Sequence, residues 1–463
     1  MKGDDYMKNI KVVIGANFGD EGKGLMTDYF AFSVKNRAAD SGIQNGGPGN
    51  GIVVRFNGGA QAGHTVTSVD GSRHIFGHLC AGAFAGLPGY LSEFFVVNPM
   101  LLLKEYAQLE RISGMRDRYD SGFSKSAAPE INTKLYMDKN CMVTTPYDMM
   151  INQIAEISRG SKKHGSCGVG FNETITRCLY DEAYALYVKD LADADAVRRK
   201  LAAIRNEYID IRLRQLGIDS IPHSYRELFA NEGIVDGFCA ETDDMLRYIE
   251  VTDIGVLSGF DNVIFEGAQG LLLDQSHEYF PHVTRSNTGV KNAVELIAKA
   301  GIYAEVSRQP AGTETGLEAG EEAVPEALPV EVIYVTRAYM TRHGAGPFPS
   351  ELPEKPYKGI VDMTNVPNPY QDVLRYGLLD IDALDRAIKK DMKNADGLKC
   401  DVRLAVTCLD QLEEKVDFIN SQEHVKAPVN EFLEILFDKL QISKGYLSYG
   451  PNREMIRLWD RND

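Results

Sequence analysis

Short runs of apolar residues recur along the chain and alternate with stretches in which apolar and polar positions follow a helical spacing. The apolar runs lie at residues 11–15, 52–56, 94–98, 263–265, 331–336 and 402–407. Strand-like runs separated by helical patterns are typical of a parallel sheet that helices cover on both faces. The pattern therefore predicts an α/β protein with a large, mostly parallel central sheet flanked by helices.

One long part of the chain carries helical spacing without strand-like runs. Residues 186–216 combine leucine and isoleucine at helical spacing with many charged residues, and residues 223–258 look helical as well. The charged positions are typical of a helix face in contact with water. We predict one domain over residues 1–463, with a helical subdomain inserted at about 150–258.

Composition and charge narrow the class of protein. The chain has 463 residues, of which 44% are hydrophobic and 25% charged, and its net charge is −16. No cluster of basic residues is dense enough to grip a nucleic-acid backbone. The seven cysteines show no CxxC spacing, and no apolar run is long enough to span a membrane, so we expect a cytoplasmic protein with reduced thiols. The segments 42–51 and 309–329 are rich in glycine or in acidic residues and predict mobile loops.

The segment at residues 12–24, VVIGANFGDEGKG, reads as a buried strand that runs into a glycine-rich turn. A helical pattern follows at 25–32. Glycines let backbone amides approach phosphate oxygens, and the helix start favours an anion. Lys23 can neutralise phosphate charge, while Asp20 can bind Mg²⁺ or accept a proton. The turn lacks the common P-loop spacing, so a glycine turn without a ligand is the alternative.

A second strand-to-loop junction, at residues 52–66, places His64 among glycines. A histidine in such a position suits acid–base chemistry. A lone histidine is also often structural, and this segment alone does not separate the two interpretations.

Six motifs, in this order along the chain, together resemble the adenylosuccinate synthetase family. They are GDEGKG at 19–24, GGAQAGHT at 58–65, FEGAQG at 265–270, PHVTRSNT at 281–288, TRHGAGPFP at 341–349 and GPNR at 450–453. The matched segments extend over nearly the whole chain. The resemblance implies a P-loop-related α/β fold, a magnesium-dependent ligase of purine biosynthesis with small-molecule substrates, and a homodimer.

In that family, L-aspartate is joined to the 6-position of IMP with GTP hydrolysis, through a 6-phosphoryl intermediate, to give adenylosuccinate. The resemblance implies that Asp20 removes the purine N1 proton and binds Mg²⁺, and that His64 donates to the oxygens at the 6-position. It implies that Lys23 binds the phosphoryl group in transfer. The residues assigned to these steps are Asp20, His64, Lys23, the amides of Gly22 and Gly24, and the carbonyl of Gly63.

The same resemblance assigns residues to three substrates. For the purine nucleotide they are Gln269, Thr284, Ser166, Cys167 and Arg177, the last of which would reach into the partner subunit's site. For the GTP base they are Asp410, Ser448, Gly450 and Pro451, and for the amino acid Arg375.

Four departures from the family's pattern leave alternatives open. Cys408 stands where the family has a lysine over the donor base, and only Arg375 aligns with an arginine of the aspartate loop. One alternative is the phage-type relative that uses (d)GMP and ATP to make the 2-amino analogue. Relatives of that type carry a serine at the position of Asp20, so Asp20 favours the enzyme that acts on IMP. The aspartate loop and Cys408 point to a specialised relative. Ala60-Gln61 and Leu25 are further departures, where the family has His-Asn and a second lysine. A nucleotide sensor without ligase activity is the last alternative.

Overall fold

The computed structural model describes residues 8–40, 50–119, 134–160, 163–303, 329–361 and 374–461. The segments predicted as mobile loops, 42–51 and 309–329, lie outside the described residues except at their ends. Within the described part of the chain, no helix is both long and apolar enough to cross a membrane.

A ten-stranded sheet is the centre of the fold, in the order β19-β18-β15-β11-β1-β10-β2-β5-β7-β9. All neighbouring strands are parallel except β18 and β19. The prediction of a mostly parallel central sheet is therefore confirmed. The strand bounds are β1 Asn9–Gly15, β2 Gly51–Arg55, β5 Gly89–Leu91, β7 Leu135–Asp138, β9 Ile249–Thr252, β10 Asn262–Glu266, β11 Val330–Arg337, β15 Cys400–Thr407, β18 Lys444–Ser448 and β19 Ile456–Asp460.

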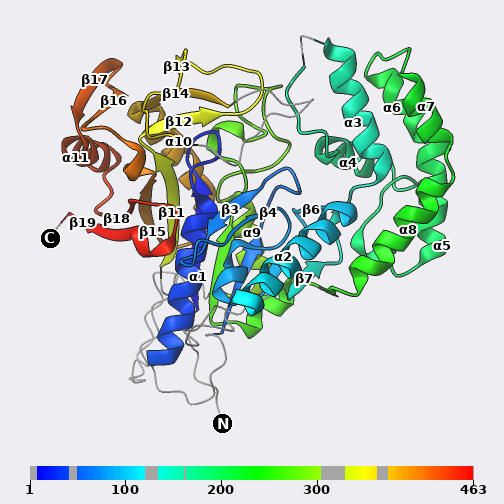
Figure 1. Ribbon diagram of the computed structural model, residues 1–463, viewed down its shortest axis with the longest axis horizontal. Helices are drawn as coiled ribbons and strands as arrows, with labels where there is room; N and C mark the ends of the chain where they lie inside the picture. The colour runs from blue at the N-terminus through cyan, green and yellow to red at the C-terminus, as the bar shows by residue number, and fades with distance from the viewer. Residues whose placement is uncertain are drawn as a thin grey trace, which may run out of the picture.

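Helices cover both faces of this sheet (Figure 1). Side chains alternate between the faces along a strand, so Val12 and Ile14 of β1 belong to one core cluster and Val13 to another. The helices that pack on the side of Val12 are α9 Lys291–Ala300, α10 Ile381–Met392 and α11 Val429–Leu440, and the helix on the side of Val13 is α1 Lys23–Asp40. Because β1 is buried from both sides, the turn that follows it starts from a rigid strand end.

A group of helices with its own core lies beside the sheet, on the right of Figure 1. Tyr147, Leu201, Tyr208 and Phe238 are buried in this core. The helices are α2 Pro99–Tyr119, α3 Pro146–Arg159, α4 Phe171–Cys178, α5 Ala194–Ala203, α6 Ile209–Gln215, α7 His223–Ala230 and α8 Gly233–Leu246. The division into one domain with a helical insertion at about 150–258 stays a proposal.

Two sequence predictions of local structure are wrong. Residues 249–252, expected to be helical, form β9, which pairs with β7 at the edge of the large sheet. The alternation of Ile249 and Val251 with polar neighbours is a strand period that the surrounding helices obscure. Residues 94–98 contribute only the two-residue strand β6, Val96–Val97, which pairs with β8, Met142–Val143, outside the large sheet.

The remaining strands form small sheets around the carboxyl ends of the large one. The hairpin of β3, His64–Thr67, and β4, Arg73–Phe76, follows β2. A five-stranded sheet contains β12 Tyr339–Arg342, β13 Glu351–Leu352, β14 Arg375–Asp380, β16 Lys415–Asn420 and β17 Glu423–Pro428.

Candidate active site

A cavity of about 1140 Å³ opens where the large sheet's strands end. The turn after β1, the loop after β10 and Arg337 at the end of β11 all line it. Parallel strands bring their carboxyl ends to one edge, and ligands of such sheets bind in the crevice outside that edge. The predicted residues that line this single cavity are Asp20, Gly22, Lys23, Gly24, Gly63, His64, Ser166, Cys167, Gln269 and Thr284.

The glycine-rich turn is built around Glu21, a residue that the sequence analysis did not single out. Its Oε1 accepts from the backbone N–H groups of Asn17 at 3.0 Å and Gly19 at 2.7 Å, and its Oε2 lies 3.1 Å from Lys23 Nζ. At Gly15, a Cβ atom would lie 2.4 Å from the carbonyl oxygen of Gln269 and 2.9 Å from Lys23 Nζ. Only glycine therefore lets the two segments approach, and Glu21 holds the lysine in the cavity wall.

Asp20 is held by His343, a second residue that the sequence analysis missed. Asp20 adopts a left-handed backbone with φ of 64°, and its Oδ2 lies 3.1 Å from His343 Nε2. Burial alone would raise the pKa of Asp20, but the hydrogen bond and charge of His343, with Arg337 and Lys23 nearby, lower it to about 2. Asp20 is therefore ionised at neutral pH.

His64 pairs with Glu266 across the cavity floor. His64 Nδ1 lies 2.6 Å from Glu266 Oε1, and Glu266 Oε2 accepts from the backbone N–H of Ala81. Burial and the nearby Arg55 lower the pKa of His64 to about 4. The neutral imidazole then donates from Nδ1 to the carboxylate. Its Nε2 is buried and has no hydrogen-bond partner among the described residues.

Gln269 and the loop that follows α3 provide polar groups elsewhere on the cavity wall. The Oε1 atom of Gln269 is buried without a partner within the described ranges, so its amide is not consumed by the fold. Ser166 accepts a hydrogen bond from Asn152 Nδ2 at 2.9 Å. Thr284 is fixed by its backbone N–H, which donates to the carbonyl of Leu273 at 2.9 Å. These side chains face a shared space, as a bound nucleotide requires.

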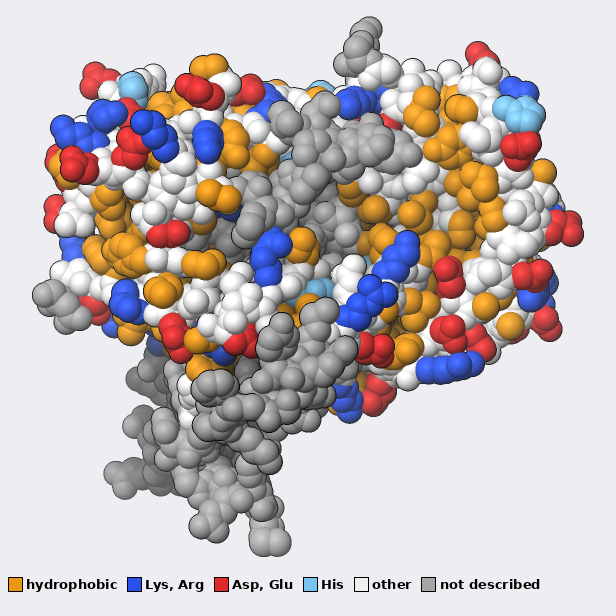
Figure 2. All heavy atoms as spheres, in the orientation of Figure 1, with side chains coloured by type: hydrophobic (Ala, Val, Ile, Leu, Met, Phe, Trp, Pro, Cys, Tyr) orange, Lys and Arg blue, Asp and Glu red, His pale blue; other side chains and the backbone are white. Residues whose placement is uncertain are grey.

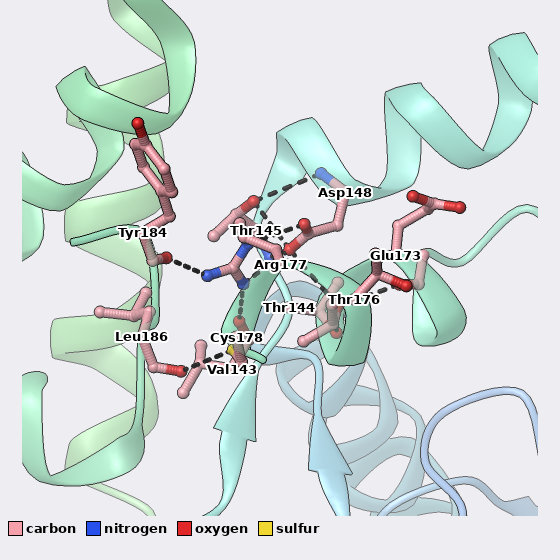
Figure 3. Close-up of polar contacts among 12 residues, drawn as sticks. Val143, Thr144, Thr145, Asp148, Glu173, Thr176, Arg177, Cys178, Tyr184 and Leu186 are labelled. Atoms are coloured by element: carbon pink, nitrogen blue, oxygen red, sulfur yellow. Dashed lines mark hydrogen bonds and ion pairs between the residues drawn. The ribbon is translucent and has the colours of Figure 1, made fainter. Parts of the chain in front are cut away.

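Arg177 is not part of this cavity, and the expectation that it reaches a partner subunit is wrong. It is 0% exposed. Its Nε lies 2.8 Å from Asp148 Oδ1. Figure 3 shows the guanidinium directed toward Asp148 and toward the carbonyls of Val143 and Tyr184, to which it donates. The sequence places Arg177 shortly after a glycine-rich loop, and that position does not predict that the side chain is buried. Because every direction is occupied, Arg177 stabilises the helical core.

The residues assigned to the donor base lie beside the cavity rather than in its wall. Asp410 and Ser448 stand at the carboxyl ends of the neighbouring strands β15 and β18, with Gly450 and Pro451 close behind. Thr407, at the end of β15, donates to the carbonyl of Glu21 at 2.6 Å. This bond ties the end of β15 to the phosphate turn, so a nucleotide that bound the turn would extend toward Asp410.

Arg375 is also outside the cavity lining. Its guanidinium forms an ion pair with Glu351 and donates to the carbonyls of Gly344 and Gly346, at 3.1 and 3.0 Å. Residues 369–372 of the aspartate loop lie outside the described residues. Arg375 therefore shapes the Gly344–Gly346 turn in this structure.

A parallel sheet with a cavity at its strand ends defines an α/β protein whose ligand site is in the usual position for that class. The chain belongs to the adenylosuccinate synthetase family, ligases that form a C–N bond: the family's sequence model matches residues 12–312. The adenylosuccinate synthetase of Ralstonia nicotianae is 31% identical over 426 residues, covering 87% of this chain and 77% of the relative. That of Mesoplasma florum is 30% identical over 396 residues, covering 82% and 74%. The match to the Acaryochloris marina enzyme, at 29% identity, spans 63% of that relative's length.

Solved structures share the fold at lower identity. Fully ligated adenylosuccinate synthetase from Plasmodium falciparum superposes with a TM-score of 0.62 at 18% identity, covering 97% of this chain and 99% of that one. The cyanophage S-2L succinoaminodeoxyadenylate synthetase, bound to dGMP and dATP, superposes with a TM-score of 0.53 at 15% identity, covering 97% and 95%. The likeness to the phage enzyme is the weaker of the two.

Proposed function

We propose that this protein joins L-aspartate to the 6-position of IMP with GTP, giving adenylosuccinate, GDP and phosphate. The observation that carries the proposal is that Asp20, Lys23 and His64 line one cavity together with Gln269 and Thr284. A carboxylate base, a cation for the phosphoryl group and an imidazole are the groups that this reaction needs in one place.

In the first step, Asp20 accepts the N1 proton and the purine O6 attacks the γ-phosphorus of GTP, so that GDP leaves. Lys23 neutralises charge on the phosphoryl oxygens. A carboxylate with a pKa of about 2 is a weak base. Turnover therefore requires the contact with His343 to loosen when the nucleotide enters.

In the second step, the amino group of aspartate attacks C6 and inorganic phosphate leaves. His64 would donate from Nε2 to the phosphoryl oxygen or O6. The imidazole is neutral when its pKa is about 4, so it becomes a donor at Nε2 only after the anionic phosphoryl group beside it raises that pKa. Glu266 orients the ring and favours the protonated form.

Mg²⁺ fits the oxygen groups at the turn. Among the described residues, no three His, Cys, Asp or Glu side chains gather into a metal site. The ion would therefore take the Asp20 carboxylate, the Gly63 carbonyl, and otherwise phosphate and water oxygens, which is the set that Mg²⁺ prefers. Bound there, it would supply charge neutralisation to the donor phosphates.

The assignments of the donor base, the amino acid and the assembly belong to the same proposal. Asp410 is exposed and can accept from both N1 and N2 of guanine. Arg375 would bind an aspartate carboxylate by exchanging Glu351 for the substrate.

Figure 2 shows hydrophobic side chains gathered over the helical part, where Ile157 and Leu228 are 48% and 39% exposed. Such a surface supports a homodimer.

The second candidate is the reaction with (d)GMP and ATP. The fold shared with the phage enzyme and Cys408 in place of the family's lysine favour it, whereas Asp20 favours IMP. The test crosses IMP, dIMP, GMP and dGMP with GTP and ATP in the presence of aspartate, and identifies products by mass spectrometry. Adenylosuccinate from IMP and GTP supports the proposal, and a 2-amino product from dGMP and ATP contradicts it. Nucleotide binding without any product would indicate a sensor.

A further inference from the structure

Arg285 lines the cavity and was not among the predicted site residues. It stands next to Thr284 in the loop before α9, and its Nη1 donates to Thr176 Oγ1 of α4 at 2.6 Å. Thr176 in turn donates to the carbonyl of Asn172 at 2.8 Å. The loop and α4 therefore hold the guanidinium in place through one of its five N–H groups, and no other hydrogen bond of Arg285 joins it to the described residues.

The other arginines near α4 are already neutralised. Arg212 forms two hydrogen bonds to the carboxylate of Glu173, at 2.6 and 3.1 Å, and Arg159 pairs with Glu156. All four of these residues line the same cavity. Arg285 has no carboxylate within ion-pair distance in the described part of the chain. It is therefore an uncompensated positive charge on the wall of a cavity, in a chain whose net charge is −16.

We propose that Arg285 binds the phosphate group of the acceptor nucleotide, as an added specificity residue within the same chain. This inference rests on the proposed function, in which the acceptor is a purine monophosphate. The glycine-rich loop before α4 has left-handed backbone at Gly165, Gly168 and Gly170, and such turns direct amides toward an anion. A guanidinium fork complements a phosphate better than any other side chain.

The consequence is a phosphate site made by one subunit. Arg177, the residue expected to cross from a partner, is consumed by Asp148. Arg285 instead supplies a cation from the loop before α9, where it contacts Thr176 of α4, and it belongs to the same chain as Asp20.

The test compares IMP with inosine, which lacks the phosphate, by titration calorimetry of the full-length protein. Arg285→Ala is expected to weaken IMP binding about ten- to a hundredfold and to leave inosine binding unchanged, while Arg285→Lys recovers part of the loss. The matched control is Arg214→Ala on α6, since Arg214 is exposed and contacts the carbonyl of Asp210. Equal effects on IMP and inosine, or none, would overturn the proposal.

Two further readings separate the alternatives. A rise in the aspartate KM with an unchanged IMP affinity would assign Arg285 to the amino acid instead and overturn the inference. Mixing Arg285→Ala chains with Asp20→Asn chains should restore no activity, because neither chain holds both groups; rescue would show that Arg285 acts across subunits. A wild-type protein that binds IMP more tightly than inosine but forms no product contradicts the proposed function alone. One that binds no purine monophosphate contradicts both.

Discussion

Glu266 Oε1 lies 2.6 Å from His64 Nδ1, although the two residues are 202 positions apart in the sequence. Glu266 is the last residue of β10, and His64 is the first of β3. Because β10 pairs in parallel with β2, and β3 is the next strand after β2 in the chain, the end of β10 lies close to the start of β3. The carboxylate selects the tautomer with a proton on Nδ1, so Nε2 is the atom of His64 that is left for a ligand.

We expect Glu266→Gln to lower kcat by about 10²-fold or more, because a neutral amide no longer stabilises a protonated imidazole and can impose the other tautomer. Steady-state kinetics with IMP, GTP and aspartate measure this loss. Glu105→Gln is the control, since Glu105 is a buried carboxylate near His74 and His78 and does not line the cavity. A kcat that the two variants lower equally would assign Glu266 a purely structural role.

Asp20→Asn should abolish turnover while purine nucleotide binding survives. The amide keeps the shape of the side chain but cannot accept the N1 proton, and loss of an essential base costs about 10²–10⁴ in rate. Single-turnover formation of the phosphoryl intermediate, measured beside nucleotide affinity, tests this role. A rate within roughly threefold of wild type would contradict it, given that expected loss.

Asp410→Asn should weaken GTP binding about ten- to a hundredfold and leave ATP binding unchanged, because an amide places a donor against guanine N1 or N2. Competition binding with both nucleotides measures the difference. Glu413→Gln removes a nearby exposed carboxylate and should change neither affinity. If ATP is the better donor for the wild-type protein, the role of Asp410 in selecting guanine is wrong.

Arg177→Ala should destabilise the protein rather than remove a substrate contact. The change leaves Asp148 buried without its partner, and breaking a buried ion pair in this way costs about 3–5 kcal/mol. Urea unfolding measures the loss. The double change Arg177→Met with Asp148→Leu should recover part of the stability. Restored activity on mixing Arg177→Ala with Asp20→Asn chains would instead indicate a site shared between subunits.

His64 should lower the free energy of unfolding of the protein as the pH falls from 6.5 to about 4. Its pKa in the folded protein is about 4, below the usual 6.5, so protons favour the unfolded chain over this interval. At about 1.4 kcal/mol per pKa unit, the contribution is on the order of 3 kcal/mol. Asp28 and Asp391, whose pKa values burial raises to about 6, act in the opposite direction. The check is therefore the difference between wild type and His64→Gln in urea unfolding across this range, and parallel curves would contradict it.

Local pattern in the sequence was enough to predict the sheet and the chemistry at its strand ends. The run into Gly15, the turn with Asp20 and Lys23, and His64 after the next strand are short-range features. Glycines allow backbone amides to approach a phosphate, and the lysine supplies positive charge, so these residue types are enough to predict a phosphate site. The family resemblance extended this to Gln269 and Thr284, which line the same cavity.

Tertiary structure alone decided which distant groups act on these residues. Glu266 reaches His64 because β10 lies beside β2, the strand that precedes His64 in the chain. His343 reaches Asp20 because β11, which β12 and His343 follow, lies beside β1. Burial also determines which arginine can contact a ligand. Arg177 is enclosed by Asp148 and two carbonyls, whereas Arg285 lines the cavity. The residue type determines the charge and the hydrogen-bonding groups of a side chain. Which of these groups can still bind a ligand depends on the neighbours that the fold places around that side chain.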